Sequence, residues 1–181
     1  MVNTSYTNPH PRRYLVADMD KCTGCESCAL ACSFIKNREF NWAASRIRIL
    51  KFEESGVDAP VFCQQCEEPR CVEACPRNAL VVNDDTGILA VDEKACDGCG
   101  ICAVACPFGA ISIQPGGDKR HKKVLKCDLC GGDPECVKWC EIKAIELVDA
   151  GEKERLHKGR EDLLMARQRY ELEHHAPLWK Y

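Results

Sequence analysis

Sixteen cysteines are the residues in this sequence whose type and spacing could do chemistry. They form four quartets with none left over: Cys22, Cys25, Cys28 and Cys32; Cys63, Cys66, Cys71 and Cys75; Cys96, Cys99, Cys102 and Cys106; and Cys127, Cys130, Cys136 and Cys140. In the first and third quartets, two, two and three residues separate successive cysteines. The middle gap widens to four residues in the second quartet and to five in the fourth. At this spacing three thiolates can converge on one metal centre, while the fourth points elsewhere.

The spacing favours iron–sulfur clusters over zinc. Gaps of two, two and three residues followed by proline are the cysteine run of bacterial ferredoxins, and Pro107 completes that run after the third quartet. Structural zinc sites usually pair cysteines a dozen or more residues apart, often with histidine, and the five histidines here lie outside every quartet. We therefore expect four 4Fe-4S clusters with all sixteen cysteines as iron ligands. A mixture that includes a 3Fe-4S cluster is the lesser alternative.

Composition excludes several other classes of protein. The apolar share of 45% falls to about 36% without cysteine, so bound clusters must supply part of the interior. The polar stretch 1–13 lacks the character of a signal peptide, and no apolar run is long enough for a membrane span. We expect a reducing cytoplasm rather than a disulfide scaffold. A net charge of −3 does not suggest nucleic-acid binding, and we interpret the basic run 119–123 as a solvated hairpin tip or, alternatively, a docking patch.

The residues around the quartets predict an α+β fold of small elements. Short helices are expected near the fourth cysteines, followed by apolar strands that end near residues 82, 113 and 147. Strands at 14–17 and 88–91 are expected to lead into the first and third quartets, and the alternating run 46–52 predicts a half-buried strand. This repeated pattern indicates two bacterial dicluster ferredoxin-like modules.

With these motifs, the chain resembles the four-cluster polyferredoxin subunits of multi-subunit oxidoreductases from about residue 14 to 148. In that family the second and third quartets form an inner module, and the first and fourth form an outer one. The resemblance implies these ligand sets: Cys63, Cys66 and Cys71 with Cys106; Cys96, Cys99 and Cys102 with Cys75; Cys22, Cys25 and Cys28 with Cys140; and Cys127, Cys130 and Cys136 with Cys32. The chain departs from the pattern at Ser33 and Glu141, which stand where the trailing proline is expected.

The resemblance also implies a function. Such subunits relay single electrons between a catalytic subunit and a flavin subunit or ferredoxin, and are not catalytic themselves. The compact fourth quartet is most similar to the small subunits that accompany tungsten aldehyde oxidoreductases. Molybdenum or tungsten formate dehydrogenases, hydrogenases, carbon monoxide dehydrogenases and a free-standing polyferredoxin shuttle are the alternatives. No nucleophile–base pair, phosphate loop or dinucleotide motif accompanies the cysteines.

The segments outside the cysteine region differ in composition. We expect an N-terminal arm at 1–13, a four-cluster domain at 14–149 and a C-terminal tail at 150–181, with one charged helix over 152–174. Its partial apolar stripe consists of Leu156, Leu163, Leu164, Tyr170 and Leu172. Because so thin a stripe stabilises an isolated helix poorly, we favour docking onto a partner or a second copy over packing on its own chain.

Overall fold

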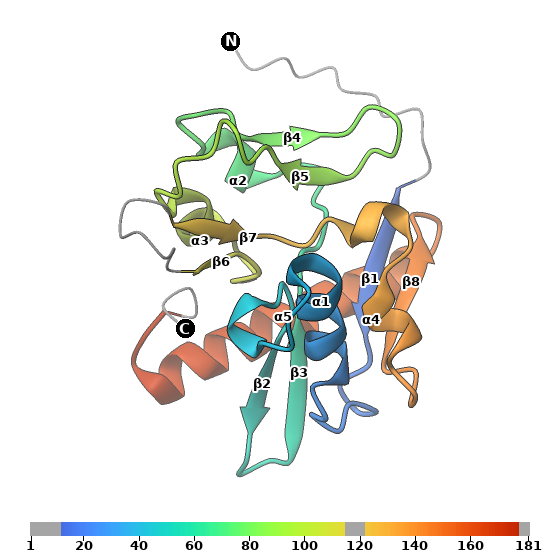
Figure 1. The fold of residues 1–181 in the computed structure, drawn as a ribbon. Helices are drawn as coiled ribbons and strands as arrows, with labels where there is room; N and C mark the ends of the chain where they lie inside the picture. Colours follow the sequence, from blue (N-terminus) through green and yellow to red (C-terminus); the bar gives the residue numbers. More distant parts are fainter. Residues whose placement is uncertain (1–11, 115–121, 178–181) are drawn as a thin grey trace.

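The computed structural model describes residues 12–114 and 122–177, and within these ranges the strands pair into four small antiparallel sheets (Figure 1). The pairs are β1 (Arg13–Ala17) with β8 (Ile145–Asp149), β2 (Arg48–Phe52) with β3 (Val57–Val61), β4 (Leu80–Val82) with β5 (Leu89–Val91), and β6 (Ser112–Gln114) with β7 (Lys123–Leu125). The helices are α1 (Ser27–Asn37), α2 (Arg70–Glu73), α3 (Ile101–Ala105), α4 (Glu135–Lys138) and α5 (Lys153–His174), with 3-10 turns η1 (Trp42–Ala44) and η2 (Leu129–Gly132). The mixture of small sheets and short helices with a C-terminal helix confirms the predicted α+β character.

The strands lie close to where the sequence predicts them. β1 and β5 match the predicted segments 14–17 and 88–91, and β2 covers most of 46–52. β4, β6 and β8 follow the second, third and fourth quartets. β6 and β7 form the expected hairpin arms, whereas residues 119–121 of the basic run lie outside the described residues.

The elements are nested rather than arranged in chain order. α2 packs against α3, and α1 packs against α4. β1 and β8, from opposite ends of the cysteine region, pair through all five of their residues. In Figure 1, α2, β4 and β5 lie at the top of the view, whereas α1, α4, β1 and β8 lie below. The helices of the second and third quartets are therefore neighbours, as are those of the first and fourth.

Proline limits two of the helices that carry cysteines. α2 and α3 stop before Cys75 and Cys106, each of which precedes a proline, and a residue before proline is disfavoured in the helical region. Ser33 follows Cys32 instead, and α1 continues to Asn37 while the Ser33 hydroxyl donates to the Leu30 carbonyl at 3.0 Å. α4 also stops before Cys140, which Glu141 follows, so proline is sufficient but not necessary to end such a helix.

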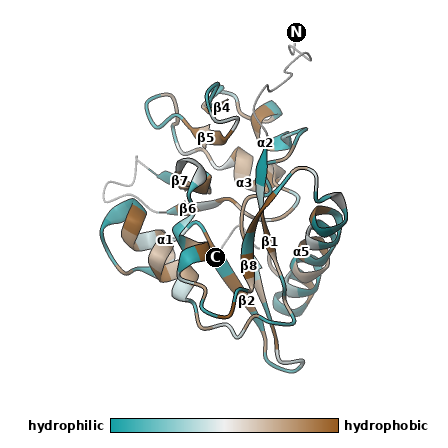
Figure 2. Ribbon diagram, turned by 90° about the vertical axis from the view of Figure 1, so that its right-hand side faces the viewer, coloured by the Kyte–Doolittle hydropathy of each residue, from teal (hydrophilic) through white to brown (hydrophobic). Residues whose placement is uncertain are grey.

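The C-terminal helix packs on its own chain. α5 lies against β1, β2 and β3, and Leu156, Leu163 and Ala166 are buried there. Leu172, which the sequence analysis places on the same stripe, is 74% exposed. Figure 2 shows hydrophilic colours over much of the helix beside the apolar β1. The described part of the tail thus belongs to the body of the fold, and its docking onto a partner stays a prediction.

Replacing Leu163 with alanine is expected to lower the free energy of unfolding by about 2–4 kcal/mol, because a fully buried side chain leaves a cavity. Leu172→Ala on the same helix should change it by less than about 0.5 kcal/mol, since that side chain faces solvent. Anaerobic urea unfolding followed by circular dichroism measures both. Equal, small losses in the two variants would contradict the packing of α5 described above.

Candidate iron–sulfur cluster sites

The structure brings together cysteines from different quartets. Burial and the nearby thiolates of Cys22, Cys25 and Cys140 raise the pKa of the Cys28 thiol to about 12. Cys140 belongs to the fourth quartet, more than a hundred positions along the chain from the other three. Burial and the thiolate of Cys140 likewise raise the pKa of Cys22.

The same exchange of fourth cysteines recurs in the other quartets. Burial and neighbouring thiolates raise the pKa of Cys71 to about 12 and that of Cys102 to about 11. The neighbours of Cys71 are Cys63, Cys106 and Cys66; those of Cys102 are Cys96, Cys75 and Cys99; and those that raise the pKa of Cys136 include Cys127, Cys32 and Cys130. We name the groups set 1 (Cys22, Cys25, Cys28, Cys140), set 2 (Cys63, Cys66, Cys71, Cys106), set 3 (Cys96, Cys99, Cys102, Cys75) and set 4 (Cys127, Cys130, Cys136, Cys32).

A recurring hydrogen bond holds the fourth cysteine of three quartets. In each, the backbone N–H four residues later donates to the cysteine Sγ: Ala79 to Cys75 at 3.4 Å, Ala110 to Cys106 at 3.4 Å and Ala144 to Cys140 at 3.2 Å. Because α1 continues past Cys32, the first quartet lacks this turn, and the N–H of Arg46 donates to Cys32 Sγ at 3.4 Å instead. Hydrogen bonds to sulfur stabilise thiolates and tune the potential of a cluster bound to them.

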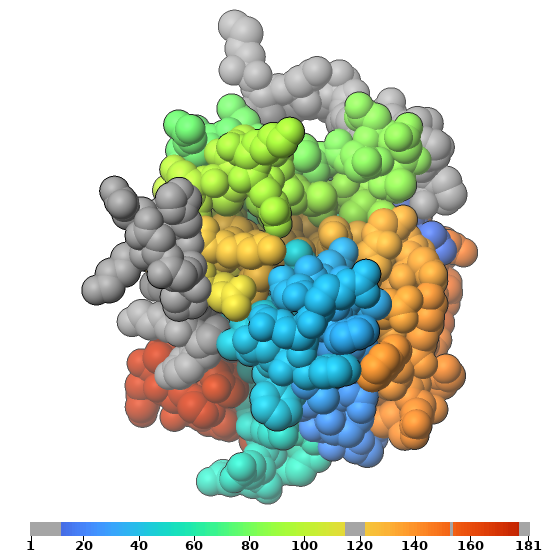
Figure 3. Space-filling view, in the orientation of Figure 1, coloured from blue at the N-terminus to red at the C-terminus, as the bar shows by residue number. Residues whose placement is uncertain are grey.

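The four sets follow one another in the order 1, 4, 2, 3. The charge of Cys28 in set 1 raises the pKa of Cys136 in set 4. In the same way, the charge of Cys63 in set 2 raises the pKa of Cys127 in set 4. Sets 2 and 3 meet through the packed helices α2 and α3. Figure 3 shows the segment around α1 and that around α4 packed side by side on one face.

Exposure differs between the ends and the middle of this series. Cys25 of set 1 and Cys99 of set 3 are exposed, whereas Cys63 and Cys127, at the junction of sets 2 and 4, are buried. The series therefore reaches the surface at both ends and is covered in its middle.

The residues present fit iron–sulfur clusters chemically. All sixteen cysteines are free thiols, and most lie where burial and neighbouring thiolates disfavour the unbound thiolate. Bound iron would supply the compensating positive charge. Two buried donors, Arg46 Nη1 and Arg160 Nε, have no hydrogen-bond partner within the described part of the chain. The inorganic sulfides of a cluster are acceptors that such donors can use.

Two buried polar residues, Lys126 and Gln65, join sets 2 and 4, and neither was predicted from the sequence. Lys126 is 3% exposed, and its Nζ donates to the carbonyls of Leu89 at 2.5 Å and Cys127 at 3.0 Å. Gln65 donates to the Cys127 carbonyl at 3.0 Å and accepts from the Leu89 N–H at 2.9 Å. Lys126 lies directly before Cys127, and Gln65 lies between Cys63 and Cys66. Because polar residues inside a ligand run lie close to the metal, this placement was the signal in the sequence that could have identified them.

An ion pair ties the first quartet to the fourth. Lys36 Nζ on α1 lies 2.6 Å from Asp128 Oδ2, and Asp128 also accepts from the Cys130 N–H at 3.1 Å. Burial would raise the pKa of Asp128, but the hydrogen bond and charge of Lys36 outweigh it and lower the pKa. The pair therefore holds the Cys130 loop against α1 with its charges balanced.

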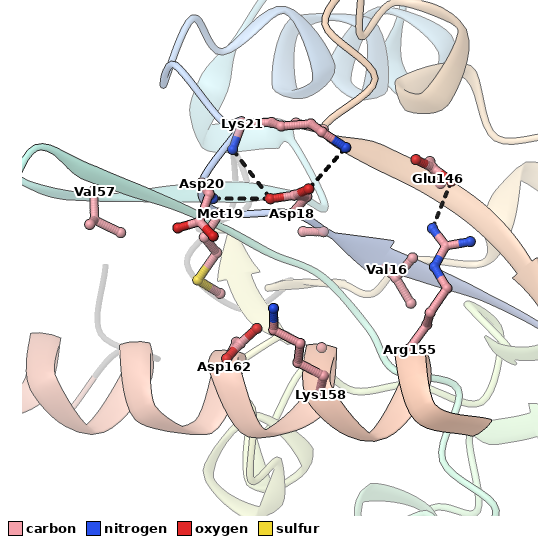
Figure 4. A pocket seen from close by; sticks show the side chains of 13 residues that line it. Val16, Asp18, Met19, Asp20, Lys21, Val57, Glu146, Arg155, Lys158 and Asp162 are labelled. Atoms are coloured by element: carbon pink, nitrogen blue, oxygen red, sulfur yellow. Dashed lines mark hydrogen bonds and ion pairs between the residues drawn. The ribbon is translucent and has the colours of Figure 1, made fainter. Parts of the chain in front are cut away.

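A cavity of about 470 Å³ lies between the loop that precedes Cys22, strand β8 and helix α5 (Figure 4). Its charged side chains largely pair with one another: Lys21 with Asp18 at 3.0 Å, and Arg155 with Glu146 at 2.7 Å. The pair of Arg155 and Glu146 joins α5 to β8, whereas that of Lys21 and Asp18 lies within the loop, and together they leave the charge of the cavity nearly balanced.

Comparison with known proteins identifies the family to which these cysteines belong. Models of a 4Fe-4S dicluster domain match residues 14–76 and 57–150. The polyferredoxin-like subunit of aliphatic sulfonate oxidoreductase from Pyrococcus furiosus is 42% identical, over 71% of this chain and 72% of the relative. An uncharacterised ferredoxin of Methanocaldococcus jannaschii is 41% identical over 72% and 69%, and formate hydrogenlyase subunit 2 of Escherichia coli is 31% identical over 83% and 89%. The chain belongs to the 4Fe-4S dicluster ferredoxin family and is an iron–sulfur electron-transfer protein.

Proposed function

We propose that each of sets 1 to 4 holds one 4Fe-4S cluster and that the chain relays electrons along the series 1, 4, 2, 3. The observation that carries this proposal is the continuous series of thiol sets with one exposed cysteine at each end, Cys25 and Cys99. A bound 4Fe-4S cluster takes up and releases one electron at a time. Four in series would form a wire through the chain.

The chain's own residues have three tasks in this function. The crossed cysteines would hold the clusters and lock the two quartets of each module together. Backbone donors such as the N–H groups of Ala110 and Ala144 stabilise the thiolates, and the buried junction at Cys63 and Cys127 excludes water from the middle of the series. The exposed ends let partner proteins approach. These tasks require no substrate chemistry, in keeping with a non-catalytic subunit.

The partner we propose is the catalytic subunit of a tungsten aldehyde oxidoreductase, with a flavin subunit or ferredoxin as the other redox partner, in the cytoplasm. The compact fourth quartet and the similarity to the polyferredoxin-like subunit of an aliphatic sulfonate oxidoreductase support an oxidoreductase complex of this kind. The similarity to formate hydrogenlyase subunit 2 favours a formate dehydrogenase or hydrogenase as the second candidate.

Within the described ranges, none of the helices has the length and apolar character needed to cross a bilayer.

Metal analysis of the complex isolated anaerobically from its host separates these partners. We expect about sixteen irons per chain together with tungsten. Molybdenum or nickel would assign the same wire to a formate dehydrogenase, hydrogenase or carbon monoxide dehydrogenase. Iron alone would favour a free-standing shuttle, and stoichiometric zinc in place of iron would overturn the cluster proposal.

Two double substitutions test the crossed ligand sets. Cys75→Ala with Cys102→Ala removes two ligands of set 3, so we expect the loss of one cluster, about four irons, with three clusters unchanged. Cys71→Ala with Cys75→Ala should disturb two clusters, because these neighbours belong to sets 2 and 3. Iron content and Mössbauer spectra count the clusters affected. If each quartet bound its own cluster, the two variants would exchange results.

Cys102→Ala tests the relay itself. In the intact complex, the rate of ferredoxin reduction should fall at least tenfold in this variant, while the catalytic subunit still reduces an artificial dye at the wild-type rate. Parallel steady-state assays with ferredoxin and with the dye measure both activities. An unchanged rate of ferredoxin reduction would show that set 3 is not part of the path.

A further inference from the structure

Positive charge is concentrated around set 2. Arg160 lies close enough to Cys66, Lys126 to Cys71 and Arg167 to Cys106 for its charge to act on that cysteine. The charge of Cys106 in turn acts on a fourth cation, Arg48, whose pKa burial lowers. Four cations from β2, α5 and the loop before Cys127 thus act on one set of four cysteines.

Backbone carbonyls near set 2 hold these cations in place. Arg167 Nη1 on α5 donates to the carbonyl of Cys106 itself at 2.5 Å, and its side chain is 17% exposed. Arg160, two turns earlier on the same face of the helix, donates to the Gln64 carbonyl at 3.5 Å. Arg48 donates to the Gly109 carbonyl, in the loop that follows Cys106. The guanidinium groups are therefore anchored to the loops that carry the thiols.

The Nε of Arg160 is a hydrogen-bond donor that a bound cluster could satisfy. This Nε is buried and has no hydrogen-bond partner within the described part of the chain. A buried N–H left unpaired is costly, and a sulfide or thiolate of a bound cluster would accept from it.

The other three sets have fewer cations close to their cysteines among the described residues. The strongest charged neighbours of Cys102 in set 3 are thiolates, and those of Cys22 in set 1 are thiolates and the carboxylate of Asp58. Two cations, Lys36 and Arg46, lie near set 4, but both act on the carboxylate of Asp128, which pairs with Lys36 at 2.6 Å and offsets much of their charge. Lys126, between Cys127 and Cys63, serves sets 4 and 2 together.

We propose that Lys126, Arg48, Arg160 and Arg167 give the cluster held by set 2 the highest reduction potential of the four. The inference rests on the proposed function, because it requires set 2 to hold a cluster. Reduction adds one negative charge, which nearby cations stabilise, and buried charges are screened by salt much less than exposed ones. Net charge and hydrogen bonding to sulfur are the main determinants of cluster potential.

Water at the ends of the series acts in the same direction but with less effect. Cys25 and Cys99 are exposed, so solvent stabilises added charge at sets 1 and 3. Solvent dipoles must reorient to do so, whereas the four cationic side chains at set 2 are already fixed in place, even though Glu171 pairs with Arg167 and offsets part of its charge. An electron that enters from either end would therefore come to rest at set 2, in the covered interior of the relay.

The test is an anaerobic redox titration of the intact complex, followed by electron paramagnetic resonance. Cys66→Ala first identifies the signal of the set 2 cluster as the one that is lost or altered. The double variant Arg160→Gln with Arg167→Gln should lower the ratio of reduced to oxidised cluster at least tenfold at a fixed potential, a shift of 59 mV for one electron. Arg167→Lys, which keeps the charge, should stay close to wild type.

The matched control is Arg169→Gln on the same helix. Arg167 and Arg169 each pair with a glutamate four residues later, Glu171 at 3.0 Å and Glu173 at 2.7 Å, but the guanidinium of Arg169 lies over the ring of Phe52 and that of Arg167 on the Cys106 carbonyl. Arg169→Gln should leave all four potentials unchanged. The inference is overturned if the signal assigned to set 2 is not the highest in potential, or if the double variant and the control behave alike. A Cys66→Ala variant that keeps four unaltered clusters would instead overturn the ligand assignment of the proposed function.

Discussion

The constraint on which the rest of the structure depends is the burial of negative charge. Four oxidised clusters with four thiolates each would carry about eight negative charges in a chain whose own net charge is already −3. Most of the thiols lie where water is excluded, and each set raises the cost of ionising its own members. Backbone N–H groups directed at sulfur and buried cations are the two means by which the fold offsets this cost.

The nested topology follows from the same constraint. Each module brings two short helices together so that the fourth cysteine of one quartet lies in the set of the other. The two modules then meet where Cys63 and Cys127, both buried, lie close enough for the charge of Cys63 to raise the pKa of Cys127. At that contact Lys126 donates to the carbonyls of Cys127 and Leu89, and Gln65 donates to the Cys127 carbonyl and accepts from the Leu89 N–H. A single buried lysine thus serves both modules.

How much the sequence could predict depends on the range of the interaction. The quartets, the strands around them and the span of the C-terminal helix follow from local spacing and periodicity, and the structure has them within a few residues. The placement of α5 could not be read in this way, because its thin apolar stripe suits a partner as well as its own chain. The cations at set 2 are harder still: Arg167 meets the Cys106 carbonyl across 61 positions of the sequence, and Arg160 meets Gln64 across 96. Only the folded chain makes these arginines neighbours of the cysteines.

The pairing of β1 with β8 has a consequence for how the protein is made. Residues 63–106, which contain every cysteine of sets 2 and 3, leave the ribosome as one continuous stretch. Sets 1 and 4, in contrast, each combine cysteines of the first and fourth quartets, because Cys140 belongs to set 1 and Cys32 to set 4. Strand β1 likewise finds its partner strand only when residues 145–149 have been synthesised. In the crossed arrangement the first quartet to emerge is among the last to be completed. Its thiols must wait, uncovered, until residues 140–149 have been synthesised, which makes protection from oxygen or an iron–sulfur delivery partner valuable during biogenesis.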